Sequence, residues 1–273
     1  MVYSSNTENA QPITRKKTRV PDLLALKGKR KISSITCYDS TFARLLEKSK
    51  VDFVLVGDSL GHVIQGLHST IPVTVNDIAY HTQCVARALH TPLLVSDMPF
   101  ASAGFDDVTA YKNCEILLRA GAEAVKIEGA SDAICRQIVQ LTQHGIPVMG
   151  HIGLTPQSVH ALGGYKIQGK TQAAEQRLLD EARKLQDAGC FAIVLELVTP
   201  SVAKLISDDL KIPTIGIGAG VNCDGQILVL QDMLGMNLDF KPKFLKHFAN
   251  LENIIVDALN TYCDEIEKEV FPE

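Results

Sequence analysis

The sequence predicts an α/β protein of the (β/α)8 barrel class, and three observations support this prediction. Eight short apolar runs alternate with longer segments of helical period along the 273 residues. The runs are continuously apolar, which is typical of parallel strands that are covered on both faces. Eight is the number of strands in such a barrel, and a barrel commonly takes about 250 residues as one domain. A doubly wound open sheet is the second choice.

The expected strands and helices follow from local patterns. Thr74 and Asp77 have the spacing of a capping box ahead of a helix over 78–89. Thr199, followed by a proline, supplies an N-cap for another helix. Segment 244–269 repeats apolar residues every three to four positions, as terminal helices do. The eight runs that predict the strands are 32–37, 51–57, 93–97, 124–127, 146–150, 191–196, 213–217 and 226–230.

Composition excludes several classes of protein. Apolar residues make up 46% and charged residues 21% of the chain, close to globular averages. The formal net charge is −4, and basic residues cluster only in 15–19 and 27–31. We expect no nucleic-acid partner, because phosphate binding needs a concentrated basic face. We also expect no membrane span, because no run reaches the roughly 18 apolar residues that one requires.

The domain organisation is predicted to be simple. Residues 1–20 are polar and lack an apolar core, so they predict a flexible tail and not a secretory signal. An organellar transit segment is the alternative for this stretch. Residues 21–273 contain no repeat or low-complexity linker, which predicts a single barrel catalytic domain with C-terminal helices.

Cysteine and histidine usage bears on location and on metal chemistry. The seven cysteines are odd in number and never spaced C-x-x-C, which indicates free thiols in a reducing compartment. We therefore expect a cytoplasmic protein. The eight histidines form neither HExxH nor a cluster of zinc spacing, so we expect no zinc site.

Four carboxylates stand at or just past the carboxyl ends of predicted strands: Asp58, Asp97, Glu128 and Glu196. In a closed barrel these ends converge on one cavity. Adjacent carboxylates cannot all remain ionised without a cation, and oxygen-only ligands favour Mg²⁺ over zinc. The alternative is that each acid caps the next helix or faces solvent, and Asp58, followed by Ser59, is the residue most open to that reading.

Other residues near these strand ends have two readings each. Lys126 precedes Glu128 by two positions, so both side chains share one face of a strand. A lysine inside a barrel is costly unless carboxylates or an anionic substrate pair with it, which favours a site role. His151, right after the fifth run, is either a hydrogen-bond donor in the site or an ordinary loop residue. The glycines of 216–220 predict either a phosphate cradle or a tightly packed turn.

Nine segments resemble one known family. The chain is similar to ketopantoate hydroxymethyltransferases over roughly residues 21–271, in order and with family-like spacing. The segments are ITCYDSTFA (35–43), LVGDSLG (55–61), STIPVTVNDIAYHT (69–82), SDMPF (96–100), RAGAEAVKIEG (119–129), GHIGLTPQS (150–158), GGYKIQG (163–169), VLELV (194–198) and IGIGAG…DGQILV (215–229).

This resemblance implies a barrel related to the phosphoenolpyruvate/pyruvate superfamily, assembled as a homodecamer. It implies transfer of a hydroxymethyl group from 5,10-methylenetetrahydrofolate to 3-methyl-2-oxobutanoate, with Mg²⁺ stabilising an enolate, in pantothenate biosynthesis. Matched position by position, it implies these roles: Asp58, Asp97 and Glu128 for the metal; Asp58, Ser59, Asp97 and Lys126 for the substrate; Glu196 as the catalytic base; and a site contact for His151.

Two other functions remain open from the sequence. A Mg²⁺-dependent C–C lyase of the same superfamily would use a similar acid cluster, but it would need no folate and would place a catalytic cysteine in a mobile loop. None of the loop segments offers such a cysteine convincingly. A barrel that only binds a keto acid would tolerate loss of Glu196 and would not exchange the ligand's C3 hydrogen.

Overall fold

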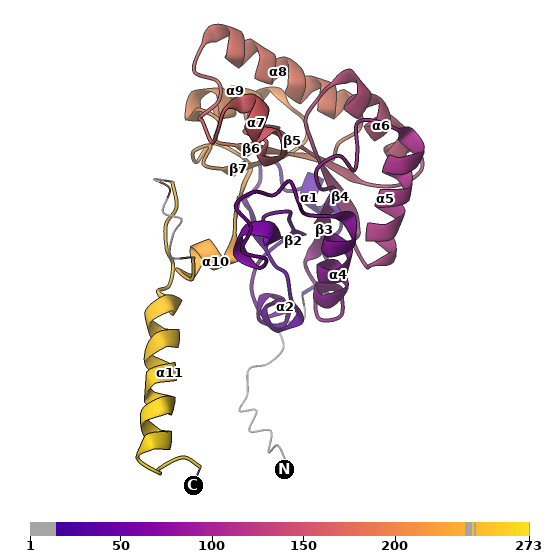
Figure 1. Ribbon diagram of the computed structural model, residues 1–273. Coiled ribbons are helices and arrows are strands. Elements are labelled where there is room, and N and C mark those ends of the chain that lie inside the picture. Colours follow the sequence, from indigo (N-terminus) through magenta and orange to yellow (C-terminus); the bar gives the residue numbers. More distant parts are fainter. Residues whose placement is uncertain (1–14, 238–241, 243, 273) are drawn as a thin grey trace.

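Eight parallel strands close into a barrel in sequence order, with β8 beside β1 (Figure 1). The computed structural model describes residues 15–237, 242 and 244–272. The predicted barrel is confirmed, and the open sheet is excluded. The strands are β1 Ile32–Thr36, β2 Phe53–Val56, β3 Leu93–Asp97, β4 Ala124–Glu128, β5 Val148–Gly153, β6 Ala192–Glu196, β7 Thr214–Ile217 and β8 Gly225–Leu228.

Helices cover the outside of the barrel and connect successive strands from β1 to β7, whereas β7 and β8 are joined by a turn over 218–224 (Figure 1). The expected capping box is present, since Thr74 accepts from Asp77 N at 3.2 Å and Asp77 accepts from Thr74 N at 2.8 Å. The helix that it caps begins at Val75, three residues earlier than expected. The helices are α1 Val20–Leu24, α2 Ser40–Glu47, α3 Leu60–Val63, α4 Val75–Ala86, α5 Asp107–Arg119, α6 Asp132–Gln143, α7 Val159–Leu162, α8 Gln172–Asp187, α9 Pro200–Asp209, α10 Leu230–Met233 and α11 Leu251–Glu267, with a 3₁₀ turn η1 Pro156–Ser158.

The barrel interior changes character along its axis. Toward the amino-terminal ends of the strands the interior is one apolar cluster. It includes Val95, Ala124, Met149 and Val194, and Leu23 of α1 packs against them. Because side chains alternate across a strand, the next inward positions on the same four strands are two residues further on. Those positions are occupied by Asp97, Lys126, His151 and Glu196. The apolar floor therefore supports an ionisable upper layer.

The segment before α1 is bonded to the barrel. Arg15 donates to the carbonyl of Ser49 at 2.7 Å, and Lys17 donates to the carbonyl of Pro92 at 2.8 Å. The described part of the expected tail, residues 15–19, thus lies against the barrel. The remainder of that expected tail, residues 1–14, lies outside the described residues.

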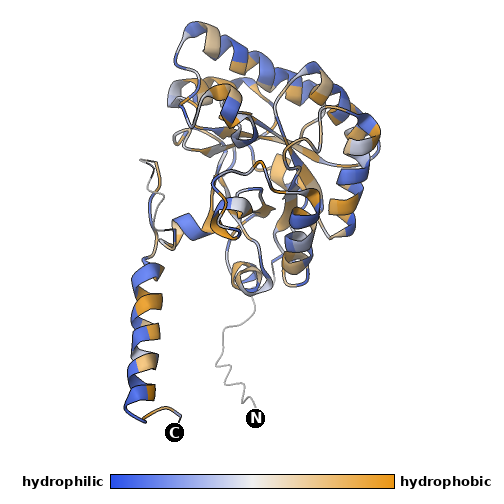
Figure 2. Cartoon of the chain, viewed as in Figure 1, coloured by the Kyte–Doolittle hydropathy of each residue, from blue (hydrophilic) through white to orange (hydrophobic). Residues whose placement is uncertain are grey.

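Helix α11 extends away from the barrel (Figure 1), and none of its residues is buried. Its apolar stripe is visible in Figure 2 and contains the expected repeat of Ile255, Leu259, Tyr262 and Ile266, which are 42% to 57% exposed. The helix begins at Leu251, so the expected start at 244 was too early. Among the described helices, none is long and apolar enough to cross a bilayer.

Candidate active site

The six charged side chains predicted for the site meet at the upper end of the barrel. They lie in strands or just after them: Asp58 after β2, Asp97 on β3, Lys126 and Glu128 on β4, His151 on β5 and Glu196 on β6. His151 lies inside its strand, paired with Glu128 and Val194 in the sheet, and not after the strand as expected. The ordinary-loop reading of His151 is therefore excluded.

Lys126 stands at the centre of this cluster. Its Nζ lies 2.9 Å from Asp97 Oδ1 and 3.4 Å from Glu128 Oε1, and all three side chains are buried. Burial lowers the pKa of Lys126, but the charges of Asp97, Glu128 and Asp58 outweigh burial and raise it. The ammonium is therefore fixed in its charged form, as a buried lysine among carboxylates must be.

The three buried carboxylates differ in their pKa. Burial raises the pKa of Asp58 well above its usual range, and the neighbouring charges of Asp97 and Glu128 raise it further. Burial also raises the pKa of Asp97, against the opposing charge of Lys126. Glu128 differs, because Lys126 and His151 outweigh its burial and lower its pKa to about 2.

His151 connects the buried cluster with Glu196. Its Nδ1 lies 3.2 Å from Glu128 Oε1, and its Nε2 lies 3.4 Å from Glu196 Oε2. Burial and the charge of Lys126 lower the pKa of His151, but Glu128 and Glu196 outweigh them and raise it to about 9. The ring thus has a carboxylate near each nitrogen, and its Nδ1 also lies 3.1 Å from Nζ of Lys126.

Glu196 is the acid that reaches the opening. Its side chain is 20% exposed, whereas those of Asp97, Glu128 and His151 are nearly inaccessible. The next residue, Leu197, has φ +46°, a region that non-glycine residues rarely adopt and that is common near functional sites. Hydrogen bonds to Ile217 and Gln168 hold the Leu197 backbone in place.

The other predicted substrate residue, Ser59, lies at the edge of the cluster. Its Oγ is 2.8 Å from the hydroxyl of Tyr38, a fully buried residue that the sequence reasoning did not single out. The carbonyl of Tyr38 is in turn 2.7 Å from Nδ1 of His81. Ser59 is therefore positioned by a polar chain that starts after β1.

Gln157 is a second residue that the sequence reasoning missed. From the 3₁₀ turn after β5, its Nε2 donates to Asp58 Oδ2 and to the carbonyl of Met98, both at 3.0 Å. Its backbone N–H donates to Glu128 Oε2 at 3.2 Å. The signal was its place in the GHIGLTPQS run, but glutamine has no acid–base chemistry to draw attention. One residue thus ties the loop to two of the acids.

The glycine-rich turn after β7 is explained by packing. Gly218 has φ +62°, and a Cβ there would lie 2.7 Å from the Leu197 side chain and 3.1 Å from Phe244. Gly220 has φ +82°, and a Cβ there would lie 2.9 Å from Pro200. These contacts favour the tightly packed turn over a phosphate cradle.

The acid pair Asp58 and Asp97 is the part of the cluster that suits a divalent cation. Both are buried hard-oxygen donors, and the backbone N–H of Asp58 donates to Asp97 Oδ2 at 3.2 Å, which brings the two residues together. Among the described residues, no set of three or more His, Cys, Asp or Glu side chains is arranged to hold a metal. The remaining ligands would come from a chelating substrate and water, as is usual for Mg²⁺.

Comparison with known proteins identifies the family of this chain. The sequence profile described as ketopantoate hydroxymethyltransferase matches residues 17–273. The chain belongs to this family. It is 48% identical over 253 residues to the 3-methyl-2-oxobutanoate hydroxymethyltransferase of Thermosipho africanus, covering 93% of this chain and 95% of that protein. It is 50% identical over 242 residues to the protein of that name from Caldicellulosiruptor saccharolyticus, covering 89% and 91%.

Solved structures share the fold. A phosphonopyruvate hydrolase in complex with oxalate and Mg²⁺ superposes with a TM-score of 0.60 at 12% identity, covering 92% of this chain and 88% of that one. A 2,3-dimethylmalate lyase, a member of the PEP mutase/isocitrate lyase superfamily, superposes with a TM-score of 0.57 at 16% identity, covering 93% and 89%. At this level of identity the likeness shows the barrel fold alone.

Proposed function

We propose that this protein transfers a hydroxymethyl group from 5,10-methylenetetrahydrofolate to 3-methyl-2-oxobutanoate, forming 2-dehydropantoate in pantothenate biosynthesis, with Mg²⁺ as cofactor. Family membership over nearly the whole chain supports the reaction class. The observation that carries the proposal is the single cluster in which a reachable Glu196 adjoins buried, oppositely charged groups.

Asp58 and Asp97 would hold the Mg²⁺, with Glu128 contacting the metal or its waters. The bound cation would act as a Lewis acid that stabilises the negative charge of the enolate. On the protein side, Lys126 places a permanent positive charge where the keto acid carboxylate binds. Ser59, held by Tyr38, offers a hydroxyl at the edge of the same pocket.

Glu196 would remove the proton from C3 of the keto acid. The carboxylate of Glu196 is accessible from the opening of the barrel, and His151 lies 3.4 Å from it on the buried side. The ring of His151 would orient this carboxylate while the reaction proceeds. The enolate would form the new C–C bond to the one-carbon unit, and one water is consumed to balance the reaction. The water oxygen becomes the hydroxyl of 2-dehydropantoate, and the second water proton and the C3 proton taken by Glu196 end on the two nitrogens of tetrahydrofolate that the one-carbon unit leaves.

The test follows the C3 hydrogen of 3-methyl-2-oxobutanoate in D₂O with Mg²⁺ and without folate. We expect the protein to exchange this hydrogen and Glu196→Gln to abolish the exchange, followed by proton NMR. Glu175→Gln, on the outer helix α8, is the matched control and should exchange normally. Undiminished exchange by Glu196→Gln would remove Glu196 from its role.

The same mixture separates the alternative functions. A lyase would make no 2-dehydropantoate on addition of 5,10-methylenetetrahydrofolate, and a binding barrel would show no exchange at all. The structure disfavours the lyase, because Cys37, which follows β1, is buried and burial raises its pKa to about 12. The exposed cysteine is Cys263 on α11, far along the chain from the loops of the site.

We propose a homo-oligomer, with the homodecamer of the resemblance as the expected state. The apolar stripe of α11 is uncovered in this chain, and β8 is followed only by the four-residue α10 before the chain leaves the barrel. A second copy that covers this stripe would bury it, as the hydrophobic effect favours. Analytical ultracentrifugation measures the mass directly, and a monomer at micromolar concentration would contradict the proposal.

We also place the enzyme in the cytoplasm. All seven cysteines are free, in agreement with a reducing compartment. Fractionation of cells that produce the protein, followed by immunodetection, tests this placement.

A further inference from the structure

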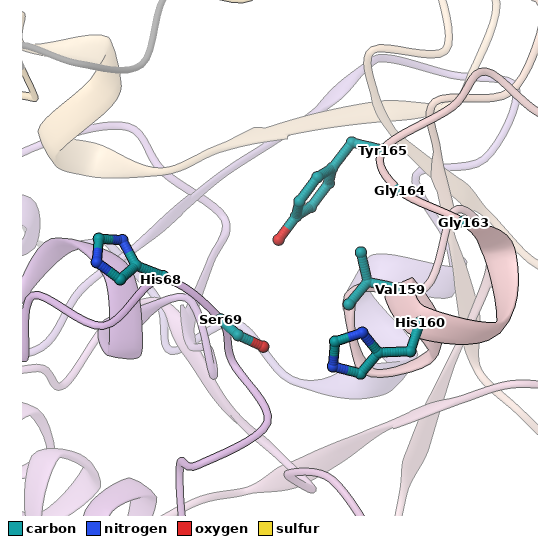
Figure 3. Close-up of a pocket in the computed structure, with 7 residues that line it drawn as sticks. All are labelled: His68, Ser69, Val159, His160, Gly163, Gly164 and Tyr165. Atoms are coloured by element: carbon teal, nitrogen blue, oxygen red, sulfur yellow. The ribbon is translucent and has the colours of Figure 1, made fainter.

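A cavity of about 310 Å³ opens at the mouth of the barrel, and no role has yet been given to it. It lies between two loops that follow strands (Figure 3). His68 and Ser69 come from the loop between α3 and α4, and residues from Val159 to Tyr165 come from the loop between β5 and α8. We refer to it as the mouth cavity.

The mouth cavity adjoins the acid cluster. The loop that supplies Tyr165 also supplies Gln157, whose side chain touches Asp58. Val159, two residues after Gln157, lines the mouth cavity itself. A molecule in the mouth cavity would therefore lie next to a substrate held by the acids.

The lining of the mouth cavity differs from the acid cluster in its chemistry. It consists of imidazole, phenol and hydroxyl groups, a valine and two glycines, without a carboxylate or an ammonium group. The ring of Tyr165 is 53% exposed, and Figure 3 shows its hydroxyl, the Ser69 hydroxyl and the His160 ring directed into the opening. Such groups suit a neutral, flat ligand with hydrogen-bonding edges, which can stack on the tyrosine.

The backbone and the rim also fit such a ligand. Gly163 and Gly164 have φ of +67° and +106°, so the loop turns there without side chains that would narrow the cavity. A cavity of this size is at the lower end of small-molecule sites, which span about 300–1,000 Å³. It would take a ring system and leave a longer tail outside. The exposed Lys166 at its rim would attract an anionic tail.

We infer that the mouth cavity binds the conjugated nitrogen heterocycle of the one-carbon donor, stacked on Tyr165, with the keto acid beneath it at the acids. This inference rests on the proposed function and extends it by assigning the donor's place. The keto acid, which lies deeper, would bind first and the donor second. The bound donor would then shield the keto acid from solvent.

The experiment measures binding of tetrahydrofolate, which carries no one-carbon unit and so cannot react. Titration calorimetry is done on the full chain with saturating Mg²⁺ and 3-methyl-2-oxobutanoate. We expect Tyr165→Ala to weaken tetrahydrofolate binding about tenfold or more, and Tyr165→Phe, which keeps the ring, to stay within about twofold. Tyr111→Ala, which removes a comparably exposed tyrosine from the outer helix α5, is the control and should bind as the parent does.

Deuterium exchange into 3-methyl-2-oxobutanoate separates this inference from the proposed function. Exchange needs no donor, so the parent should exchange the C3 hydrogen in the absence of tetrahydrofolate, whatever its affinity for tetrahydrofolate is. Parental affinity in Tyr165→Ala, or a parent that does not bind tetrahydrofolate, would overturn the mouth cavity as the donor site. A parent that binds tetrahydrofolate but fails to exchange would instead refute the proposed function and leave the cavity as a heterocycle site.

Discussion

Nε2 of His151 lies 3.4 Å from Oε2 of Glu196, and Nδ1 of the same ring lies 3.2 Å from Oε1 of Glu128. The ring of His151 therefore lies between a nearly inaccessible carboxylate of the site, Glu128, and the most accessible one, Glu196. Both contacts come from a residue within β5, so the ring is held by the sheet and not by a loop. The orientation of Glu196 depends on a rigid part of the fold.

Replacing His151 should slow proton removal without removing the base. In His151→Gln the carboxylate of Glu196 loses the ring that lies beside it, and a loss of about 10²-fold in the exchange rate is expected. The rate is read from proton NMR of 3-methyl-2-oxobutanoate in D₂O. His144→Gln, at the end of the outer helix α6, serves as the control. A variant at position 151 that exchanges as fast as the parent would show that this contact has no catalytic use.

Gln157 should control the opening of the loop over the site. Gln157→Ala loses the bonds to Asp58 and to the carbonyl of Met98, each worth about 1 kcal/mol, so the loop should open about 30-fold more often. Lys166 and Lys170 in this loop are exposed, and brief trypsin treatment with mass spectrometry measures cleavage after them.

The control for this loop experiment is Gln83→Ala, which removes an exposed glutamine from α4. It should leave the cleavage rate at 166 and 170 unchanged. Equal cleavage of the parent and Gln157→Ala would mean that other contacts hold the loop. Mg²⁺ with keto acid should slow cleavage in both proteins, because a filled site stabilises the closed loop.

Asp58→Asn should raise the Tm of the metal-free protein and abolish the further rise in Tm that Mg²⁺ causes. Burial and neighbouring charges raise the pKa of Asp58, so its ionised form is disfavoured in the folded protein and costs stability above the ordinary pKa of an aspartate. Removing that charge should raise the metal-free Tm, by roughly 2–4 °C for each kcal/mol gained. The variant should also lose the Mg²⁺-dependent rise in Tm that the parent shows.

Scanning fluorimetry with and without MgCl₂ measures both effects on Asp58→Asn. Asp97→Asn should likewise lose the Mg²⁺-dependent rise. Asp187→Asn, at the exposed end of α8, is the control and should keep the parental response to Mg²⁺. If Asp58→Asn and Asp97→Asn both keep that response, these residues do not bind the metal.

Asp52 provides a pH-dependent prediction away from the site. Burial raises its pKa, but the hydrogen bonds and charge of Arg30 and the backbone of Ser33 outweigh burial and lower it. Because the folded pKa lies below the unfolded value, the stabilisation is fully present above about pH 4 and is lost as the pH falls through the folded pKa.

Asp52→Asn should therefore destabilise the protein by about 2 kcal/mol at pH 7 and by less as the pH falls below 4. Urea unfolding followed by circular dichroism at several pH values measures the difference. Asp187→Asn again provides the comparison, since no ion pair of Asp187 is found among the described residues. A constant difference from pH 7 to pH 3 would contradict the assigned role of the charge.

The sequence by itself determined the barrel, the family and the identity of the acids. Continuous apolar runs identify parallel strands, and parallel strands place all their carboxyl ends on one face, so Asp58, Asp97, Glu128 and Glu196 had to converge. The two-residue period likewise placed Lys126 beside Glu128. These conclusions need only the local periodicity of the chain and the closure of the sheet.

Only the tertiary structure decided how those groups are partnered. Gln157 and Asp58 are 99 positions apart, and their bond depends on how the loop after β5 folds back over the mouth. The place of His151 depends on the register of β5 against β4 and β6. Loop conformation and strand register arise from many weak contacts summed over distant residues, and no local pattern encodes them.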